Sequence, residues 1–300
     1  SSKGPELSVV IASVNGRAYL ADCLAGLQRQ CGEVTAEVIV VTAGASDVAP
    51  FVAREYPHVR LLAVDGAPSV PRLRAAGIQA ARGEIVAITE DHCIPAPTWF
   101  ESIRESHEKR AAAAIGGVVD NAATNRLVDW AVYFCEYGGY ASPLPAGPNA
   151  DLAGPNVSYK RSALEAVQES IADEYWETFV HGELARLGHQ LWREPSICVL
   201  HKMHFGFLSF LIERYHFGRA FAGRRNLALG WTMRVVRGTL SPLLVPLFIL
   251  RISRKTLVRR RHRLRFACCL PMICCFAAAA ALGEGVGYAL GGGTSSLRMR

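Results

Sequence analysis

Apolar residues in the N-terminal third of the chain follow two alternating patterns. Short, nearly continuous apolar runs predict strands buried on both faces, and longer segments with apolar residues at helical spacing predict helices between them. The predicted strands are 7–12, 37–42, 59–64 and 84–89, and the predicted helices are 18–30, 48–56 and 71–81. This alternation predicts an α/β fold with a mostly parallel sheet that has helices on both faces.

Polar residues stand where several of these strands end. Ligands of open parallel sheets bind beyond the carboxyl ends of the strands, so we expect these residues to form a site. They are Ser13 and Asn15 after the first strand, Thr42 to Asp47 after the second, and Glu90, Asp91 and His92 after the fourth.

The turn after the first strand argues against the two common phosphate-binding loops. It has no Gly-x-Gly-x-x-Gly, and no strand is followed by a Gly-x-x-x-x-Gly-Lys-Ser/Thr loop. A phosphate-bearing ligand then needs another positive partner. Carboxylate and imidazole groups bind divalent cations, so Glu90 and His92 predict a metal site at this strand end.

Charge divides the chain into two parts. Residues 1–213 carry 17 Lys and Arg against 25 Asp and Glu, whereas residues 214–300 carry 16 against a single acid, Glu284. Eight of these basic residues lie at 251–265, between the uncharged runs 239–250 and 266–283. We therefore predict a catalytic domain at 1–205 and an amphipathic and transmembrane helical region at 206–300.

The run 266–283 is near the lower limit for crossing a bilayer core of about 30 Å. The basic cluster before it predicts an inner-membrane protein whose upstream part, with the catalytic domain, is cytoplasmic. The shorter run 239–250 contains two prolines and favours a re-entrant or interfacial segment. Alternatively, both runs are core helices of a soluble protein. Nucleic acid is not an expected partner, because no aromatic residues are interleaved with the arginines.

Two further segments carry weaker signals. None of the nine cysteines forms a Cys-x-x-Cys pair, and four lie in the apolar tail, which predicts reduced thiols and neither a disulfide framework nor a zinc site. Residues 121–151 are rich in aromatic residues, proline and glycine, which suits an acceptor-binding lid or an irregular connector.

An ordered series of motifs over residues 6–205 resembles the family-2 glycosyltransferases. The matching segments are Ser8–Asn15, Glu37–Asp47, Arg74–Gly77, Ala81–Glu84, Glu90–His92 with Pro95 and Trp99, Gly154–Arg161, Leu187–Pro195 and Val199–His201. Glu90-Asp91-His92 takes the place of the family's Asp-x-Asp motif. The resemblance implies a GT-A fold and sugar transfer from a nucleotide-sugar donor with inversion of configuration.

The resemblance also implies roles for individual residues. Glu90 and His92 would bind Mg²⁺ or Mn²⁺ on the diphosphate of the donor, and His201 resembles a distal histidine that some members add to the metal shell. Imidazole ligands favour Mn²⁺ over Mg²⁺. Asp91 would be a spacer or a ribose contact, and Asn156 belongs to a segment that lines the donor and acceptor side. A plain strand-end histidine is the alternative for His201.

Glu177 is the residue that the resemblance implies as the general base. The family's acidic pair falls here on Trp176 and Glu177, which departs from the usual Glu-Asp pair. Asp173 and Glu183 are substitutes, and a plain surface helix is the alternative for Glu177.

Three residues are candidate nucleotide contacts. Thr42 stands where the family normally has an aspartate that contacts the base, so a UDP-sugar is favoured and GDP or another nucleotide stays open. Asp47 contacts the nucleotide or caps the next helix. Arg74 pairs with the diphosphate or the base, or is a surface charge.

Three classes of function follow from these observations. The first is a membrane-associated glycosyltransferase with an acceptor that is unknown and can be lipid-linked. The second is a nucleotidyltransferase of similar fold, against which stands the absence of a Gly-rich, Lys-containing phosphate loop. The third is a non-catalytic GT-A-like binding protein.

Overall fold

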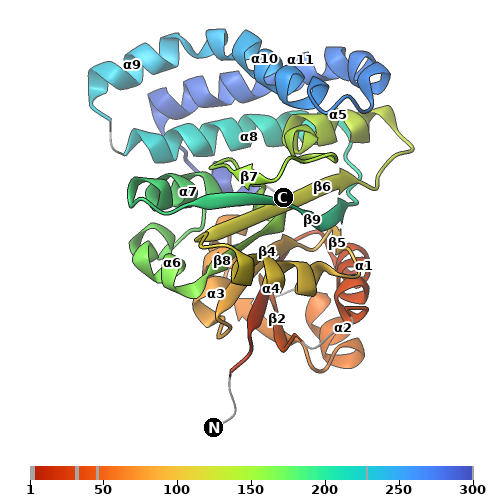
Figure 1. The fold of residues 1–300 in the computed structure, drawn as a ribbon. Helices are drawn as coiled ribbons and strands as arrows, with labels where there is room; N and C mark the ends of the chain where they lie inside the picture. Colours follow the sequence, from red (N-terminus) through yellow and green to blue (C-terminus); the bar gives the residue numbers. More distant parts are fainter. Residues whose placement is uncertain (1–3, 31–33, 45–46, 228, 299–300) are drawn as a thin grey trace. The chain divides into compact units, whose positions relative to one another are not determined.

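The computed structural model describes residues 4–30, 34–44, 47–227 and 229–298 (Figure 1). The chain forms two compact units, one of Ser1–Ala122 with Tyr140–Lys202 and one of Ala123–Gly139 with Met203–Arg300. The division into a catalytic domain at 1–205 and a helical region at 206–300 stays a prediction. Cys31 and positions 45 and 46 of the predicted second strand-end loop lie outside the described residues.

The predicted elements of the first unit are confirmed, with ends that differ by one or two residues. The strands are β1 (Leu7–Ser13), β2 (Ala36–Ala43), β3 (Arg60–Val64) and β4 (Ile85–Glu90), and the helices between them are α1 (Arg17–Gln28), α2 (Val48–Glu55) and α3 (Val70–Ala80). β1 is buried along its whole length, as a continuous apolar run requires.

Among the described residues, nine strands form one sheet, whose main order is β3-β2-β1-β4-β8-β6-β9-β5. Its further strands are β5 (Cys93–Pro95), β6 (Ala114–Asn121), β7 (Gly147–Pro148), β8 (Val157–Lys160) and β9 (Leu191–His201). The predicted α/β class is confirmed, and the first four strands pair in parallel. β8 inserts antiparallel between β4 and β6, and β5 and β7 pair antiparallel with β9, which the sequence did not predict.

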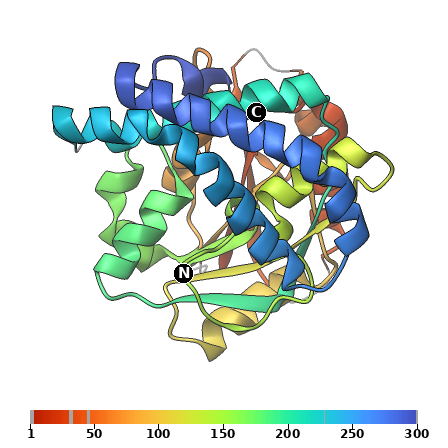
Figure 2. The same cartoon turned by 90° about the horizontal axis from the view of Figure 1, so that it is seen from above.

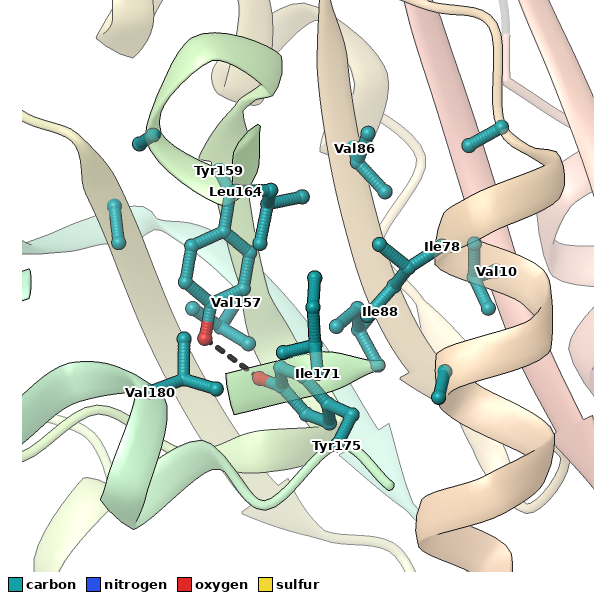
Figure 3. Close-up of a cluster of buried hydrophobic side chains, with 14 of the residues drawn as sticks. Val10, Ile78, Val86, Ile88, Val157, Tyr159, Leu164, Ile171, Tyr175 and Val180 are labelled. Atoms are coloured by element: carbon teal, nitrogen blue, oxygen red, sulfur yellow. Dashed lines mark hydrogen bonds between the residues drawn. The ribbon is translucent and has the colours of Figure 1, made fainter. Parts of the chain in front are cut away.

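The remaining helices of the first unit flank this second half of the sheet. They are α4 (Trp99–Lys109), α6 (Arg161–Ala166) and α7 (Glu177–Arg186). Buried side chains from β1, β4, β8, α3 and α7 form one apolar cluster (Figure 3). Inside it, the hydroxyls of Tyr159 and Tyr175 are 2.6 Å apart, so the polar atoms of these buried rings satisfy each other.

Close packing fixes α3 against the sheet. A Cβ atom on Gly77 would lie 2.3 Å from Val10 Cγ1 and 2.9 Å from Val41 Cγ2, so only glycine lets the helix approach β1 and β2 this closely. Ser69 caps the helix by accepting a hydrogen bond from the backbone N–H of Arg72 at 3.3 Å. α3 therefore has a defined position relative to the strand ends.

The second unit is helical. It contains α5 (Leu127–Glu136), α8 (Phe207–Asn226), α9 (Trp231–Thr239), α10 (Leu244–Leu257) and α11 (Arg263–Leu290). α8 and α11 run side by side (Figure 1, Figure 2). By length and composition, α11 is the one described helix that can cross a bilayer alone; α9 and the segment Ser241–Leu257 meet the same criteria as a pair bent by 50°. α5 forms a buried helix in the stretch that was expected to be a lid or connector.

Candidate active site

Strand pairing brings the predicted candidates to one edge of the sheet. Glu90 ends β4 and is paired with Ala12 of β1, while Ser13 is paired with Thr42 at the end of β2. His201 ends β9 and is paired with Cys93, the residue after His92. The expected site at the carboxyl ends of the strands is thus assembled from β1, β2, β4 and β9.

Glu90, His92 and His201 lie in direct contact. Nε2 of His92 is 3.0 Å from Oε2 of Glu90, and the two imidazole rings pack edge to face with centroids 4.7 Å apart. His92 and His201 are buried, and the Glu90 side chain is 14% exposed. One carboxylate and two imidazoles therefore lie together at the sheet edge, largely shielded from solvent. Glu90, His92 and His201 form the metal-site corner.

Asp91 holds this corner to the turn after β1. Its fully buried carboxylate accepts hydrogen bonds from the backbone N–H groups of Val14 and Asn15 at 2.9 and 2.8 Å, and from the Asn15 amide at 2.9 Å. It also lies 3.0 Å from Nδ1 of His92. These contacts orient the His92 ring so that Nε2 faces Glu90. They account for Asp91 and Asn15 as positioning residues, and the predicted ligand contacts of both stay predictions.

Opposed electrostatic effects act within the corner. Burial works against ionisation of Glu90, but the charge and hydrogen bond of His92 and the charge of Arg74 hold its pKa at about 2. Burial likewise opposes a charge on His92, yet Glu90 and Asp91 raise its pKa to about 10. For His201, burial and the neighbouring charge of His92 lower the pKa to about 3. Without a bound cation, Glu90 is therefore a carboxylate, His92 an imidazolium and His201 a neutral imidazole at neutral pH.

Arg74 links the metal-site corner to the predicted base. Its guanidinium donates a hydrogen bond from Nη2 to Oε1 of Glu90, and its Nη1 lies 3.6 Å from Oε2 of Glu177. Arg74 is buried, so it is not the surface charge that the sequence left open. Glu177 begins α7, its side chain is 31% exposed, and a Cβ on Gly154 would lie 3.1 Å from its carboxylate.

Contacts outside the site set the distance between α3 and α7. Glu174 accepts hydrogen bonds from the Ser69 hydroxyl at 3.0 Å and from the Trp176 indole at 2.9 Å. The backbone N–H of Tyr175 donates to the carbonyl oxygen of Pro71 at 2.9 Å. These bonds join the start of α3, which carries Arg74, to the segment that leads into Glu177.

The donor set fits a divalent cation. Nε2 of His92 lies 3.0 Å from Oε2 of Glu90, which is a hydrogen-bond distance, so a proton stands between the two candidate ligand atoms. A cation that displaced this proton would find a carboxylate oxygen and an imidazole nitrogen side by side, because metal ligands must be deprotonated. Cys93 also lies close, because its thiol and donor atoms of Glu90 and His92 are all within 4.8 Å of one another. Burial raises the pKa of Cys93 well above its usual range, so it stays a thiol and a poor ligand for these hard ions.

Several predicted contacts have a different local setting. Asp47 is the N-cap residue of α2, as the capping interpretation predicted, but its side chain makes no capping hydrogen bond. The Asn156 side chain is buried, accepts a hydrogen bond from the Trp99 indole at 2.9 Å and donates to the carbonyls of Val118 and Ile197. This saturated amide is a structural residue, which corrects the predicted donor contact.

Ser13 and Thr42 are both buried where β1 and β2 end. The Ser13 hydroxyl has no hydrogen-bond partner among the described residues, which leaves it available at the predicted ligand edge. The nucleotide contacts of Ser13, Thr42, Asp47 and Arg74, and the metal contact of His201, stay predictions.

The bridging role of Arg74 and the anchoring roles of Asp91 and Asn15 were not predicted. Asp91 looked like a spacer, because sequence position alone does not reveal that the turn after β1 donates to it. A buried strand end followed by three adjacent polar residues is the signal that points to such an anchor, since a buried carboxylate needs donors.

A mostly parallel sheet with a carboxylate and two imidazoles at its strand ends suits a phosphate-bearing ligand with a metal ion, and comparisons with known proteins identify the class. The family model described as "Glycosyl transferase family 2" matches residues 8–168, so the chain belongs to that family. It is 31% identical over 101 residues to EpsH of Bacillus subtilis (strain 168), whose name assigns it to the glycosyltransferases. This match covers 32% of the chain and spans only 27% of EpsH.

Solved glycosyltransferase structures share the fold. The mannosyltransferase PcManGT from Pyrobaculum calidifontis, solved with GDP-Man and Mn²⁺, has a TM-score of 0.58 at 15% identity, over 94% of this chain and 88% of that one. GalNAc-T7, solved with UDP, GalNAc and Mn²⁺, has a TM-score of 0.55 at 13% identity, over 68% of this chain and 45% of that one. These likenesses establish the GT-A fold that the sequence predicted.

Proposed function

We propose that the protein transfers a sugar from a nucleotide-sugar donor and uses a divalent cation, Mn²⁺ or Mg²⁺. The observation that carries this proposal is the convergence of Glu90, His92 and His201 with Arg74 and Glu177 at one edge of the sheet, in a member of glycosyl transferase family 2. PcManGT and GalNAc-T7, which share the fold, were both solved with Mn²⁺.

Glu90 and His92, with His201 beside them, would hold the cation. When bound, a cation stabilises the negative charge that the departing nucleoside diphosphate gains in the transition state, by several kcal/mol. Arg74 holds Glu90 in place and balances its charge, because its guanidinium bonds that carboxylate directly. Asp91 fixes the orientation of His92.

Glu177 is our candidate for the general base. Its carboxylate is partly exposed, so an acceptor hydroxyl can reach it, and its Oε2 lies 3.6 Å from Nη1 of Arg74, the residue that also bonds Glu90. As the acceptor oxygen attacks the anomeric carbon, Glu177 takes the hydroxyl proton and the bond to the nucleoside diphosphate breaks. Attack from the face opposite the leaving group inverts the configuration.

The sequence and the neighbouring structures support our choice of donor and acceptor classes. A UDP-sugar is our first choice of donor, with a GDP-sugar as the second, because the neighbouring structures hold UDP and GDP-Man. The acceptor that we propose is lipid-linked, at the cytoplasmic face of the inner membrane. The apolar length of α11 and the basic residues before it support membrane association.

Nucleotide release tests the function. The full chain in detergent is incubated with a panel of UDP- and GDP-sugars and with Mn²⁺ or Mg²⁺, and nucleoside diphosphate is measured. We expect release from one donor, loss of release with EDTA, and a drop of about 10²–10³ for Glu90→Gln. Glu55→Gln, an exposed acid on α2, is the matched control.

The other function classes give different results. Pyrophosphate release from a nucleoside triphosphate would replace the proposal with a nucleotidyltransferase. Nucleotide-sugar binding without any release would indicate a non-catalytic binding protein, and equal activity of Glu90→Gln and the wild type would remove Glu90 from the mechanism.

A further inference from the structure

The outer face of α9 is apolar. Trp231 is 74% exposed, and three further apolar residues of the helix are also exposed. These are Met233, Val235 and Val236. None of the residues of α9 is buried, so this apolar surface is not covered within the unit.

The arginines of α9 point the other way. Arg234 turns back into the unit and donates hydrogen bonds to the carbonyls of Leu229 and Asn226, both at 3.0 Å. Arg237 lies over the Tyr288 ring of α11, with its guanidinium carbon 5.9 Å from the ring centroid. A helix that faces water has the opposite arrangement, with charged residues outward and apolar residues inward.

The apolar surface continues on α10 and α11. Leu247 and Leu250 of α10 are more than half exposed, and Leu264 of α11 is 85% exposed. From Phe266 onward, the one charged residue of α11 is Glu284, which is buried. From Phe266 onward, the exposed side of α11 therefore consists of apolar and cysteine side chains, among them Cys268, Cys274, Cys275 and Leu282.

Protein covers the other side of α11 along both halves of the helix. In the first half, the Phe266 ring packs against Phe134 of α5, with centroids 5.3 Å apart. In the second half, a Cβ on Gly283 would lie 2.0 Å from the backbone oxygen of Tyr215, so α8 lies directly against the helix. α11 is held between α5 and α8 and is not an isolated helix in lipid.

The helices that cover α11 carry charged groups. α8 contains Glu213, Arg214 and Arg219, and Arg219 donates a hydrogen bond to the carbonyl of Gly291 at 3.1 Å. α5 contains the buried Asp129. If α11 crossed a bilayer, these groups would enter the hydrocarbon core with it, where charged side chains are expensive. An orientation along the membrane surface avoids this cost.

Charge indicates which lipids fit this surface. Residues 214–300 carry 16 Lys and Arg and a single acid. Arg251 and Arg254 are exposed on α10, on the same helix as the exposed leucines. An apolar face bordered by basic side chains matches the boundary between acyl chains and anionic headgroups.

We propose that α9, α10 and α11 form an in-plane docking surface for an anionic lipid leaflet, with α11 lying in the interface and not crossing the bilayer. This inference rests on the membrane association proposed above and adds its lipid class and its geometry. The apolar side chains enter the headgroup and acyl boundary, and the arginines contact the lipid phosphates.

Depth measurements along α11 test the geometry. The full chain with Cys268, Cys274 and Cys275 replaced by serine gives the background signal. A nitroxide label is then placed at Leu264→Cys, at restored Cys275 or at Leu290→Cys, with the protein on vesicles of anionic lipid. We expect one common depth, about 5–10 Å below the phosphates. A depth that is greatest at Cys275 and falls towards both ends would overturn the proposal, as would labels that do not contact lipid.

Vesicle binding tests the lipid class. We expect Arg251→Gln with Arg254→Gln to weaken binding to anionic vesicles by about fivefold for each arginine. Arg54→Gln with Arg186→Gln, two exposed arginines of the first unit, is the matched control. Equal binding of the wild type to neutral and anionic vesicles would refute the proposed lipid class. Nucleotide release in detergent is scored separately, so an inactive protein with the expected depth pattern would overturn only the proposed enzyme function.

Discussion

Arg74 connects two parts of the candidate site, the candidate metal ligand Glu90 and the candidate base Glu177. Its guanidinium reaches Glu90 with one nitrogen and Glu177 with the other. A planar fork can serve two carboxylates at once, which the single ammonium group of lysine cannot do with the same geometry. The positions of the candidate metal ligand and the candidate base therefore depend on each other through this side chain.

We predict that Arg74→Lys keeps the fold and lowers kcat/KM by about 10–100-fold, the usual cost of losing a partner of a metal ligand. Mn²⁺ affinity, measured by titration, should fall with it. Arg72→Lys is the control, because Arg72 is exposed on the same helix. Unchanged metal affinity in Arg74→Lys would contradict the prediction.

A second prediction concerns the base. Glu177→Gln preserves the shape of the side chain but removes the proton acceptor, so we expect kcat to fall by about 10²–10⁴ while the Kd of the nucleotide sugar is unchanged. Glu183→Gln on the same helix is the control, since Glu183 pairs with Arg186 at 2.6 Å. If only Glu183→Gln loses turnover, the base has been assigned to the wrong turn of α7.

At the scale of elements, a buried polar cluster joins β8 to α7. The hydroxyl of Tyr159 lies 2.6 Å from both the Tyr175 hydroxyl and Nε2 of His181. Burial lowers the pKa of His181 to about 4, so the ring is neutral in the folded protein. In the unfolded chain a histidine has a pKa of about 6.5.

Stability should therefore fall in acid. Between about pH 6.5 and pH 4, His181 is protonated in the unfolded chain but stays neutral in the folded protein. The free energy of unfolding therefore falls by up to about 1.4 kcal/mol for each pH unit of acidification. Urea unfolding at pH 7 and pH 5 should show a smaller loss for His181→Gln than for the wild type. His58→Gln, at an exposed histidine of the first unit, should behave like the wild type.

Elements with a local sequence signal were predicted well, and those set by distant pairing were not. β1 to β4 and α1 to α3 follow from periodicity within single segments. The insertion of β8 between β4 and β6 depends on contacts between segments far apart in the chain, which periodicity does not encode. α5 was missed because its buried helix lies in a stretch whose glycines and prolines dominate the local signal.

The site shows the same division. Glu90 and His92 became candidates because they adjoin a recognisable strand end, and Glu177 became one through the family resemblance; the roles of all three stay predictions. The contacts of Arg74 and Asp91 come from elements that pack together only in the fold. Asn156 was assigned to the ligand site, but its buried side chain bonds the backbone of the sheet. Sequence position alone does not distinguish these two uses of a polar residue.

At the scale of the whole molecule, the chain forms two compact units, and a substitution can be chosen within either one. A Cβ on Gly283 meets the backbone of Tyr215, whereas a Cβ on Gly182 in α7 meets nothing within 4 Å. We predict that Gly283→Ala speeds hydrogen exchange in α8 and α11 and leaves exchange in the sheet unchanged. Gly182→Ala should stabilise α7 by up to about 1 kcal/mol, because alanine favours helix. Slower exchange in α11 of Gly283→Ala would contradict the close packing.

Because the apolar side chains of α9 face outward and its arginines face inward, its tolerance of substitution is the reverse of that of a helix that faces water. At Trp231 or Val235, a change to a charged residue would improve solubility in water and weaken attachment to lipid. At Arg234, a change to leucine would leave two backbone carbonyls without their donor inside the unit. A screen for better expression in water would thus enrich charged residues at the outer positions, and so select the variants that have lost their attachment to the membrane.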